Sequence, residues 1–226
     1  MKIEIAKEDV KTERECGKLL EEIAWVLLSA AEGTATFVKS EQYVTAGRVD
    51  IIVLADLVQM GGSLRREAYV WELKAPQLEI FEVKTQSLAQ PSSHLYGAET
   101  QLMHYYQSII NDSILLRRLE ILSPEHVKFG GVIIGRDDNF VKNKLKNLDE
   151  TTGERLAHEA NEIRDKYVYR QLNMNLWTWD NVLYLAQAKQ LSNQRIEGDP
   201  STTIDLQSKA ELTTKTTEVS WDIEEK

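Results

Sequence analysis

The stretch that decides the fold is Tyr69-Val70-Trp71-Glu72-Leu73-Lys74-Ala75. Its β-branched and aromatic residues predict a strand, and only one carboxylate and one amine interrupt the apolar run. Because side chains alternate along a strand, Glu72 and Lys74 should share one face, opposite Trp71. Two charges on a buried strand are costly unless they pair or bind a metal. The stretch therefore indicates a functional site built on a strand.

A second predicted strand lies upstream and carries an acidic residue near its start. Residues 48–56 form an apolar run that contains Asp50, and Met60-Gly61-Gly62-Ser63 has the composition of a turn between antiparallel strands. Asp50, Glu72 and Lys74 then have the layout of a hairpin with a divalent-metal site and a lysine beside it. The alternative is an ordinary cross-strand salt bridge, since Glu-x-Lys is common by chance. The upstream aspartate, the glycine turn and the apolar flanks favour the metal site.

The hydrolysis of a phosphodiester bond needs a metal that polarises the phosphate and a nucleophilic water nearby. Mg²⁺ takes oxygen ligands, commonly one or two carboxylates with waters and substrate phosphate, and Mn²⁺ is the second candidate. Asp50 and Glu72 are the predicted carboxylate ligands, and the backbone carbonyl of Leu73 can add a third oxygen. Lys74 is expected to orient the attacking water or to stabilise negative charge that develops on the phosphate.

A predicted helix over residues 93–110 carries the next candidate residues. Gln101 and Tyr105 are four positions apart and so share one side of a helix. Gln101 could hydrogen-bond a water on the metal or a phosphate, while Tyr105 could brace the helix or contact a backbone phosphate. A plain amphipathic helix with buried tyrosines explains the same residues equally well.

The rest of the chain alternates between helical and strand patterns, except at residues 77–93, where the pattern weakens. Helices are expected at residues 6–31, 114–122, 154–173 and 182–190, the last capped by Asp180 and Asn181, and strands at 34–39, 129–135 and 176–179. Residues 136–139 should cap the element that follows them. The first helix carries three glutamates, Glu15, Glu21 and Glu22. Their side chains either belong to a solvated face or point toward the metal. Residues 1–190 are expected to form one domain and residues 191–226 a polar, flexible tail.

The composition limits the classes of partner and compartment. The chain has 226 residues and a net charge of −9, from 27 basic and 36 acidic residues, which weighs against a nonspecific nucleic-acid coat but not against a local basic groove. A single cysteine, Cys16, forms no internal disulfide and fits a reducing cytosol. The apolar run at 23–31 falls far short of the ~20 residues that span a bilayer, and residues 1–5 lack the pattern of a secretion signal. We therefore expect a cytoplasmic protein without a membrane association.

Few other motifs suggest chemistry. The four histidines are scattered and none pairs with another or with Cys16 at a metal-ligand spacing, so no zinc site is expected. The phosphate-binding loop of nucleotide hydrolases is missing from the sequence, so no nucleotide cofactor is expected. A basic cluster consists of Lys142, Lys144 and Lys146. These side chains either belong to a solvated face or contact DNA phosphates.

Several of these segments, in this order and spacing, resemble a known nuclease superfamily. The resemblance to the PD-(D/E)XK nucleases, in their RecB-like branch, rests on Gly47-Arg48-Val49-Asp50, Trp71-Glu72-Leu73-Lys74-Ala75-Pro76 and Gln101-x-x-x-Tyr105. A narrower resemblance, to the nuclease domain of Shedu anti-phage defence proteins, rests on residues 70–76, 130–136, 172–173 and 177–183. Together the segments lie between about residues 10 and 190.

The resemblance implies an α/β fold, a restriction-endonuclease-like core with a central mixed sheet flanked by helices, and metal-dependent cleavage of double-stranded DNA. It also implies that Asp50 and Glu72 bind metal, that Lys74 is catalytic and that Gln101 belongs to the site. The proline-aspartate of the superfamily name is Val49-Asp50 here. The N-terminal regulatory region that many Shedu proteins carry is not expected in this chain, and the polar tail does not map to the family.

Two functional classes follow. The first is a metal-dependent DNA endonuclease in anti-phage defence, and the second is a catalytically silent module that uses the same fold to bind nucleic acid or a protein. The presence of Asp50, Glu72, Lys74 and Gln101 together favours the enzyme, because a silent copy has no chemical reason to keep all four. The acidic net charge favours the silent module, or an enzyme that gains a basic groove as a homo-oligomer.

Overall fold

The computed structural model describes residues 15–16, 20, 23–28, 35–143, 145 and 148–197. The chain forms two compact units, Met1–Ala188 and Lys189–Lys226. Of the elements in the described residues, the first unit holds both sheets and all of the helices except the end of α6 (Trp179–Glu197). Within the described part of the chain, no helix is both long enough and apolar enough to cross a membrane.

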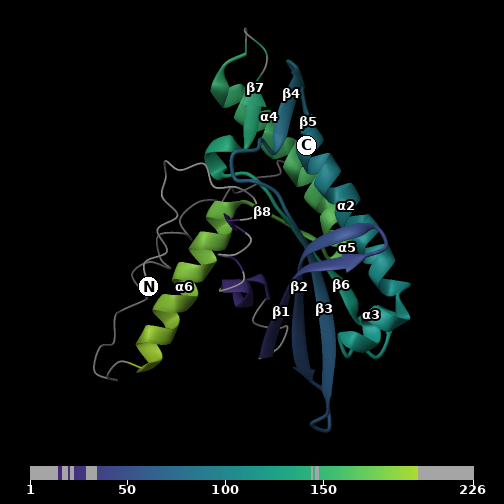
Figure 1. Ribbon diagram of the computed structural model, residues 1–226. Helices are drawn as coiled ribbons and strands as arrows, with labels where there is room; N and C mark the ends of the chain where they lie inside the picture. The colour runs from purple at the N-terminus through teal and green to yellow at the C-terminus, as the bar shows by residue number, and fades with distance from the viewer. Residues whose placement is uncertain are drawn as a thin grey trace, which may run out of the picture. The chain divides into compact units, whose positions relative to one another are not determined.

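A five-stranded mixed sheet forms the centre of the first unit (Figure 1). Its strands in spatial order are β1 (Ala35–Val44), β2 (Gly47–Val58), β3 (Leu64–Leu73), β6 (Val127–Ile133) and β8 (Asn175–Trp177). The pairs β1–β2 and β2–β3 are antiparallel, whereas β3–β6 and β6–β8 are parallel. The expected α/β fold with a central mixed sheet is therefore confirmed, as are the expected strand pair and its glycine turn, in which Gly61 and Gly62 have positive φ.

A second, three-stranded sheet lies where the sequence predicted no element. It consists of β5 (Leu88–Pro91), β4 (Phe81–Thr85) and β7 (Val141–Asn143). The weakened pattern at residues 77–93 gave no indication of β4 and β5, and the expectation that residues 136–139 cap an element was wrong. Those residues form a 3-10 turn (η3, Asp137–Asn139) that leads into β7. These strands have only three to five residues, and β4 pairs in parallel with the distant β7, so local patterning gave little signal.

Side-chain caps fix where the long helices α2 and α4 begin. The helical elements are α2 (Ser93–Ile110), α3 (Ser113–Arg118), α4 (Glu150–Arg164), a π-turn η4 (Asp165–Tyr169), α5 (Arg170–Leu172) and α6 (Trp179–Glu197), with 3-10 turns η1 (Ala24–Leu27) and η2 (Pro124–His126). The prediction of α2 is confirmed, and the Ser92 hydroxyl accepts a hydrogen bond from the backbone N–H of Leu95. α4 begins four residues earlier than expected because the side chain of Asp149 caps it.

The cap expected for the last helix was also wrong. α6 begins at Trp179, and Thr178 and Asn181 cap it reciprocally: the Thr178 hydroxyl accepts from the Asn181 N–H, and the Asn181 side chain accepts from the Thr178 N–H. Asp180 instead accepts hydrogen bonds from the side chain of Arg136 and the backbone N–H of Asp137. The helix also runs past its expected end, to Glu197.

The start of the chain is described only in part. The described residues of the expected helix at 6–31 are helical at Glu15, Cys16, Leu20 and Ile23, and η1 follows directly. Cys16 is buried among apolar side chains, as expected. Glu15 is exposed, and Glu21 and Glu22 lie outside the described residues, so a role for these glutamates at the metal stays a prediction.

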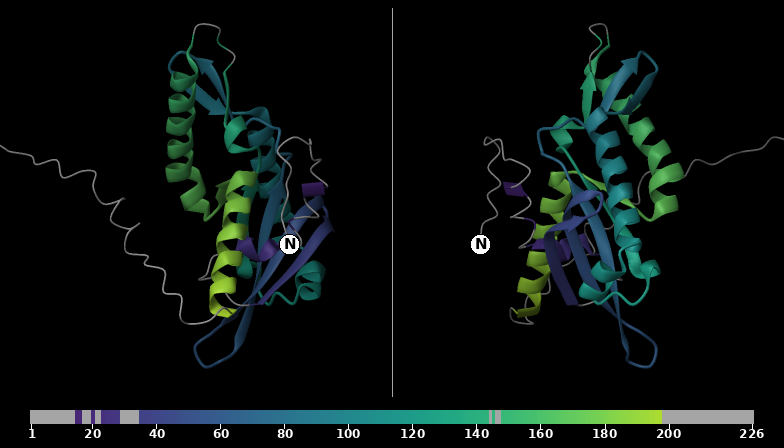
Figure 2. Two further views of the ribbon diagram at one scale, coloured as in Figure 1. Left: turned by 90° about the vertical axis from the view of Figure 1, so that its left-hand side faces the viewer. Right: turned by 45° about the vertical axis from the view of Figure 1, so that its right-hand side comes forward.

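Strand alternation divides the interior into two apolar layers, one on each face of the central sheet. Ile52, Leu54 and Val70 pack with α2, whereas Ile51, Val53 and Trp71 pack with the N-terminal segment and the first part of α6. Figure 2 shows α2 on one side of the sheet and α6 on the other. Even-numbered positions near the end of β3 thus face α2, which places Glu72 on the α2 side.

A buried ion pair joins α2 to the end of α4. The Glu99 carboxylate, 3% exposed, accepts hydrogen bonds from the Arg164 guanidinium and, at 2.6 Å, from the Tyr169 hydroxyl. Tyr169 is the last residue of the π-turn, and the Arg164 guanidinium lies 5.6 Å from the centre of its ring. The extra residue of the π-turn therefore helps to place both partners against Glu99.

We expect Glu99→Ala to lower the free energy of unfolding by about 3–5 kcal/mol, because it leaves a largely buried guanidinium without its carboxylate. Thermal unfolding followed by circular dichroism should show a melting temperature roughly 10 °C lower. Glu159→Ala is the matched control, since Glu159 forms an exposed ion pair with Arg155 on the same helix and should change stability by under about 1 kcal/mol. Equal losses in both variants would contradict the role of Glu99.

Candidate active site

The predicted metal ligands meet where β2 and β3 stop pairing with each other. The antiparallel ladder between these strands ends at the pair Ile51–Trp71. Asp50 is the next residue of β2 beyond this last pair. Its side chain enters between the strands, and its Oδ2 accepts a hydrogen bond of 2.9 Å from the Leu73 N–H. Because the N–H and C=O of a strand residue point to the same side, the Leu73 carbonyl also faces this gap. The three predicted oxygen ligands are thus brought to one place.

Glu72 is the most deeply buried of the predicted site residues. Its side chain is only 2% exposed, and its Oε1 accepts a hydrogen bond of 2.5 Å from the Lys74 ammonium. The second oxygen, Oε2, is buried and has no hydrogen-bond partner among the described residues. An unpaired buried carboxylate oxygen is costly in a folded protein. We read this oxygen as a ligand position.

The site holds two largely buried carboxylates and one ammonium group, so its ionised form has an excess of negative charge. Burial, and then the charge of Asp50, raise the pKa of Glu72 to about 8, although the nearby Lys74 acts in the opposite direction. Burial also raises the pKa of Asp50 against the opposing effects of the Leu73 N–H and the Lys74 charge. A divalent cation would stabilise the ionised form of both carboxylates.

The donor set fits a hard cation that keeps part of its coordination for waters and substrate. No group of three or more His, Cys, Asp or Glu side chains able to hold a metal occurs in the described residues. Two carboxylates and one carbonyl are instead the few protein oxygens with which Mg²⁺ is commonly bound when a phosphate completes the site. The residues present therefore fit Mg²⁺ or Mn²⁺ better than they fit zinc, which prefers four nitrogen or sulfur ligands.

One comparison with known proteins bears on this geometry. The family model described as Shedu protein SduA, C-terminal, matches residues 10–183. The chain belongs to this Shedu family. The match includes the stretch from β2 to the start of α6, and it confirms the Shedu resemblance, while the PD-(D/E)XK branch stays a prediction. A search of curated proteins gave no match.

In this Shedu-family chain the backbone of Lys74 is held from two sides. Its N–H donates to the Ile133 carbonyl of β6 at 2.8 Å, and its carbonyl accepts from the Trp179 indole N–H at 2.8 Å. Trp179 is a supporting residue to which the sequence alone assigned no role. Its signal was weak: a tryptophan that is buried usually needs a partner for its N–H, but the sequence does not say which one.

The two candidate residues on α2 differ in their surroundings. Tyr105 is buried, and this burial together with the charges of Glu72 and Asp50 raises the pKa of its phenol. Its ring also lies against the β1–β2 hairpin, where a Cβ added to Gly47 would be 3.5 Å from Cε1 of Tyr105. Gln101 is exposed one turn earlier on the helix. The roles predicted for these residues, in the site and toward DNA, stay predictions.

The basic cluster is described only in part. Lys142 on β7 is exposed and forms an ion pair with Glu79, and this ion pair lowers the pKa of Glu79. Lys144 and Lys146 lie outside the described residues. A contact between these lysines and DNA stays a prediction.

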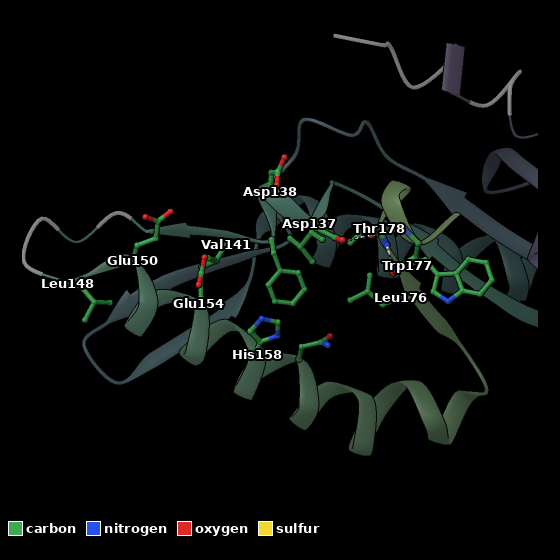
Figure 3. Close-up of a pocket in the computed structure, with 14 residues that line it drawn as sticks. Asp137, Asp138, Val141, Leu148, Glu150, Glu154, His158, Leu176, Trp177 and Thr178 are labelled. Atoms are coloured by element: carbon green, nitrogen blue, oxygen red, sulfur yellow. Dashed lines mark hydrogen bonds between the residues drawn. The ribbon is translucent and has the colours of Figure 1, made fainter. Parts of the chain in front are cut away.

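A cavity of about 1000 Å³ lies apart from the carboxylates, between α4, the η3 turn and β8 (Figure 3). It is lined by Ile80, Asp137, Asp138, Phe140, Val141, Leu148, Glu150, Glu154, His158, Asn161, Leu176, Trp177, Thr178 and Asn181. These described lining residues include four carboxylates and no lysine or arginine. Such a lining repels a polyanion, so the geometry at Asp50 and Glu72, rather than the size of this cavity, locates the candidate active site.

Proposed function

We propose that this Shedu-family chain is a metal-dependent DNA endonuclease that hydrolyses phosphodiester bonds and acts in defence against phage. The observation that carries the proposal is the meeting of Asp50, Glu72 and Lys74 at the separated ends of β2 and β3, with Oε2 of Glu72 buried and unpaired. Membership of the Shedu family supports the role in defence.

The carboxylates of Asp50 and Glu72 and the carbonyl of Leu73 would hold the cation. A bound Mg²⁺ or Mn²⁺ would polarise the phosphate and make a nearby water more acidic. Asp50 contributes through a side chain already fixed by the Leu73 N–H, so its orientation does not have to be set when substrate arrives. Burial of Glu72 removes competing bulk water from one wall of the site.

Lys74 supplies the positive charge that faces the reacting phosphate. Its ammonium lies on the same strand face as Glu72, and Glu72 holds it at 2.5 Å. From this position it can donate a hydrogen bond to the attacking water, or to the phosphate oxygen on which charge develops in the transition state. The hydrogen bonds at its backbone limit how far the strand end can move.

The test is an incubation of the purified protein with linear and closed-circular duplex DNA, in Mg²⁺ or Mn²⁺ and in EDTA. We expect metal-dependent nicking or cutting by the wild type and none by Glu72→Ala. Equal cutting in EDTA, or by the variant, would overturn the proposal. If the wild type binds DNA but cuts under no condition, the silent binding module becomes the better assignment, and a plaque assay with cells that express either protein would then show no protection that depends on Glu72.

A further inference from the structure

Gly97 lies inside α2 at a position where the described part of the chain gives no reason for a glycine. α2 is an 18-residue helix, and Gly97 follows its first turn. The φ of Gly97 is not positive, and a Cβ added to it would meet no described atom within 4 Å. A glycine inside a helix destabilises a protein relative to alanine. Neither the backbone conformation nor packing against the described residues therefore requires a glycine here.

Gly97 begins a row of residues that leads toward the candidate active site. Gly97, Gln101 and Tyr105 are each four residues apart, so they lie along one side of α2, and we call them the α2 row. Tyr105, at the far end of the row, lies against the β1–β2 hairpin, because a Cβ added to Gly47 would be 3.5 Å from its ring. Figure 1 shows the curled end of this hairpin beside α2. Gly47 comes shortly before Asp50 on β2, so this end of the row lies near the first carboxylate.

The beginning of α2 is joined to the chain that follows Lys74. The Ser92 hydroxyl, which caps the helix, donates a hydrogen bond of 2.7 Å to the carbonyl of Glu79. α2 therefore runs from the segment after β3 to the hairpin end of β2, and Glu72 lies on the side of β3 that faces this helix. A DNA strand that reaches Glu72 and Lys74 must pass α2.

The surface of α2 suits a polyanion better than that of α4. The single acidic residue of α2, Glu99, is buried and paired with Arg164, so the helix exposes no carboxylate. Its exposed polar side chains include His94, Gln101 and His104, each of which can donate a hydrogen bond. α4 instead exposes four glutamates. In a chain with a net charge of −9, a phosphate backbone is therefore repelled less along α2 than along α4.

A glycine lets another molecule approach the backbone of a helix more closely than any other residue does. Asp50 and Glu72 are largely buried, so a phosphate reaches them only if the DNA comes close to the surrounding protein. A side chain at position 97 would hold the DNA away from α2.

We propose that the sugar–phosphate backbone of the DNA runs along the α2 row and touches the helix at Gly97, where the lack of a side chain lets the strand settle onto the candidate active site. This proposal rests on the proposed function, to which it adds a DNA-contact residue. It also gives a reason for a glycine that costs the helix stability.

The first measurement is the affinity for fluorescent duplex DNA in Ca²⁺, by anisotropy, of the wild type, Gly97→Ala and Gly97→Leu. The Kd should rise with the size of the side chain, roughly threefold for Gly97→Ala and tenfold or more for Gly97→Leu, because extra atoms are forced into a packed contact. Gly97→Ala should at the same time raise the melting temperature by roughly 2–4 °C, since alanine is the better helix former. A damaged fold would not combine lower affinity with higher stability.

Gln107→Leu is the matched control. Gln107 is exposed on α2 two residues from Tyr105, so it lies on another side of the helix than the α2 row. This variant receives the same side chain as Gly97→Leu and should keep the Kd of the wild type within about twofold. Circular dichroism should show that all of the variants are folded.

The outcomes separate this proposal from the proposed function. Loss of affinity in both Gly97 variants, but not in Gln107→Leu, supports it even if no cleavage is seen. Metal-dependent cleavage by the wild type, with an unchanged Kd in Gly97→Leu, would overturn it and leave the nuclease assignment intact. A change of oligomeric state in Gly97→Leu, seen by size-exclusion chromatography, would instead make this side of α2 a protein contact and would also overturn it. A wild type without affinity for DNA would overturn both proposals.

Discussion

Replacing Glu72 with glutamine should abolish cleavage and at the same time make the protein more resistant to heat above neutral pH. Cleavage should fall roughly 10³-fold or more, because a neutral amide replaces a charged oxygen ligand in a site that works by electrostatic stabilisation. The gain in stability has a separate cause. The ionised carboxylate of Glu72 is buried beside Asp50, and glutamine has the same shape without the charge.

The pH dependence of this gain follows from the raised pKa of Glu72. Its pKa is about 8 in the folded protein, against an ordinary value of 4.5, so the folded state binds the proton more tightly than the unfolded state does. The free energy of unfolding of the wild type should therefore fall as the pH rises through this window and level off above it. The variant cannot ionise at this position and should not show that fall.

Melting temperatures measured from pH 5 to pH 9 check this prediction. The two proteins should have similar melting temperatures at pH 5. At pH 9 the free energy of unfolding of the variant should be higher by on the order of 3 kcal/mol, which raises its melting temperature by roughly 10 °C. The loss of the ion pair with Lys74 opposes the gain, but burial is the larger cause of the shift. Parallel pH profiles for the two proteins would contradict the assignment.

Added Mg²⁺ gives a second check on the same pair of proteins. A ligand that binds the folded state raises the melting temperature, so the wild type should gain stability at pH 8 and the Glu72→Gln variant should gain much less. Glu159→Gln, at an exposed position on α4, is the control and should respond to Mg²⁺ as the wild type does. An equal gain in all three proteins would mean that Glu72 is not a ligand.

Lys74→Ala should lower kcat by roughly 10²–10⁴-fold without unfolding the protein. The fold should survive because the two hydrogen bonds that position residue 74, to Ile133 and Trp179, are made by its backbone. Lys74→Arg should restore little activity, because a planar guanidinium does not replace a compact ammonium at 2.5 Å from Glu72.

The control for Lys74→Ala is Lys84→Ala. Lys84 also pairs with a glutamate of its own strand, Glu82, but it lies on β4 in the second sheet. Circular dichroism should show both variants folded, and plasmid cleavage should separate them. A Lys74→Ala protein that cuts in Mg²⁺ at the wild-type rate would exclude the catalytic role of this lysine.

The elements predicted correctly are those whose sequence pattern depends only on residues close together in the chain. Residues 48–56 and 69–75 read as paired strands because apolar, β-branched residues fill both and glycines separate them. The helix predicted over residues 93–110 has the limits of α2, and in the structure the side chain of Ser92 caps its start. The strands β4, β5 and β7 escaped prediction because each has only three to five residues, and β7 depends on the distant β4 for its backbone hydrogen bonds.

The candidate site shows the same division. The sequence by itself determined which groups the site contains, since period-two alternation puts Glu72 and Lys74 on one face and the strand pair brings Asp50 to them. Only the tertiary structure decided that β2 and β3 separate at this point, that Oε2 of Glu72 is buried without a partner, and that Trp179 supports the backbone of Lys74. The reason is physical: alternation is a property of one strand, whereas burial, strand separation and a contact 105 residues away depend on how the whole chain packs.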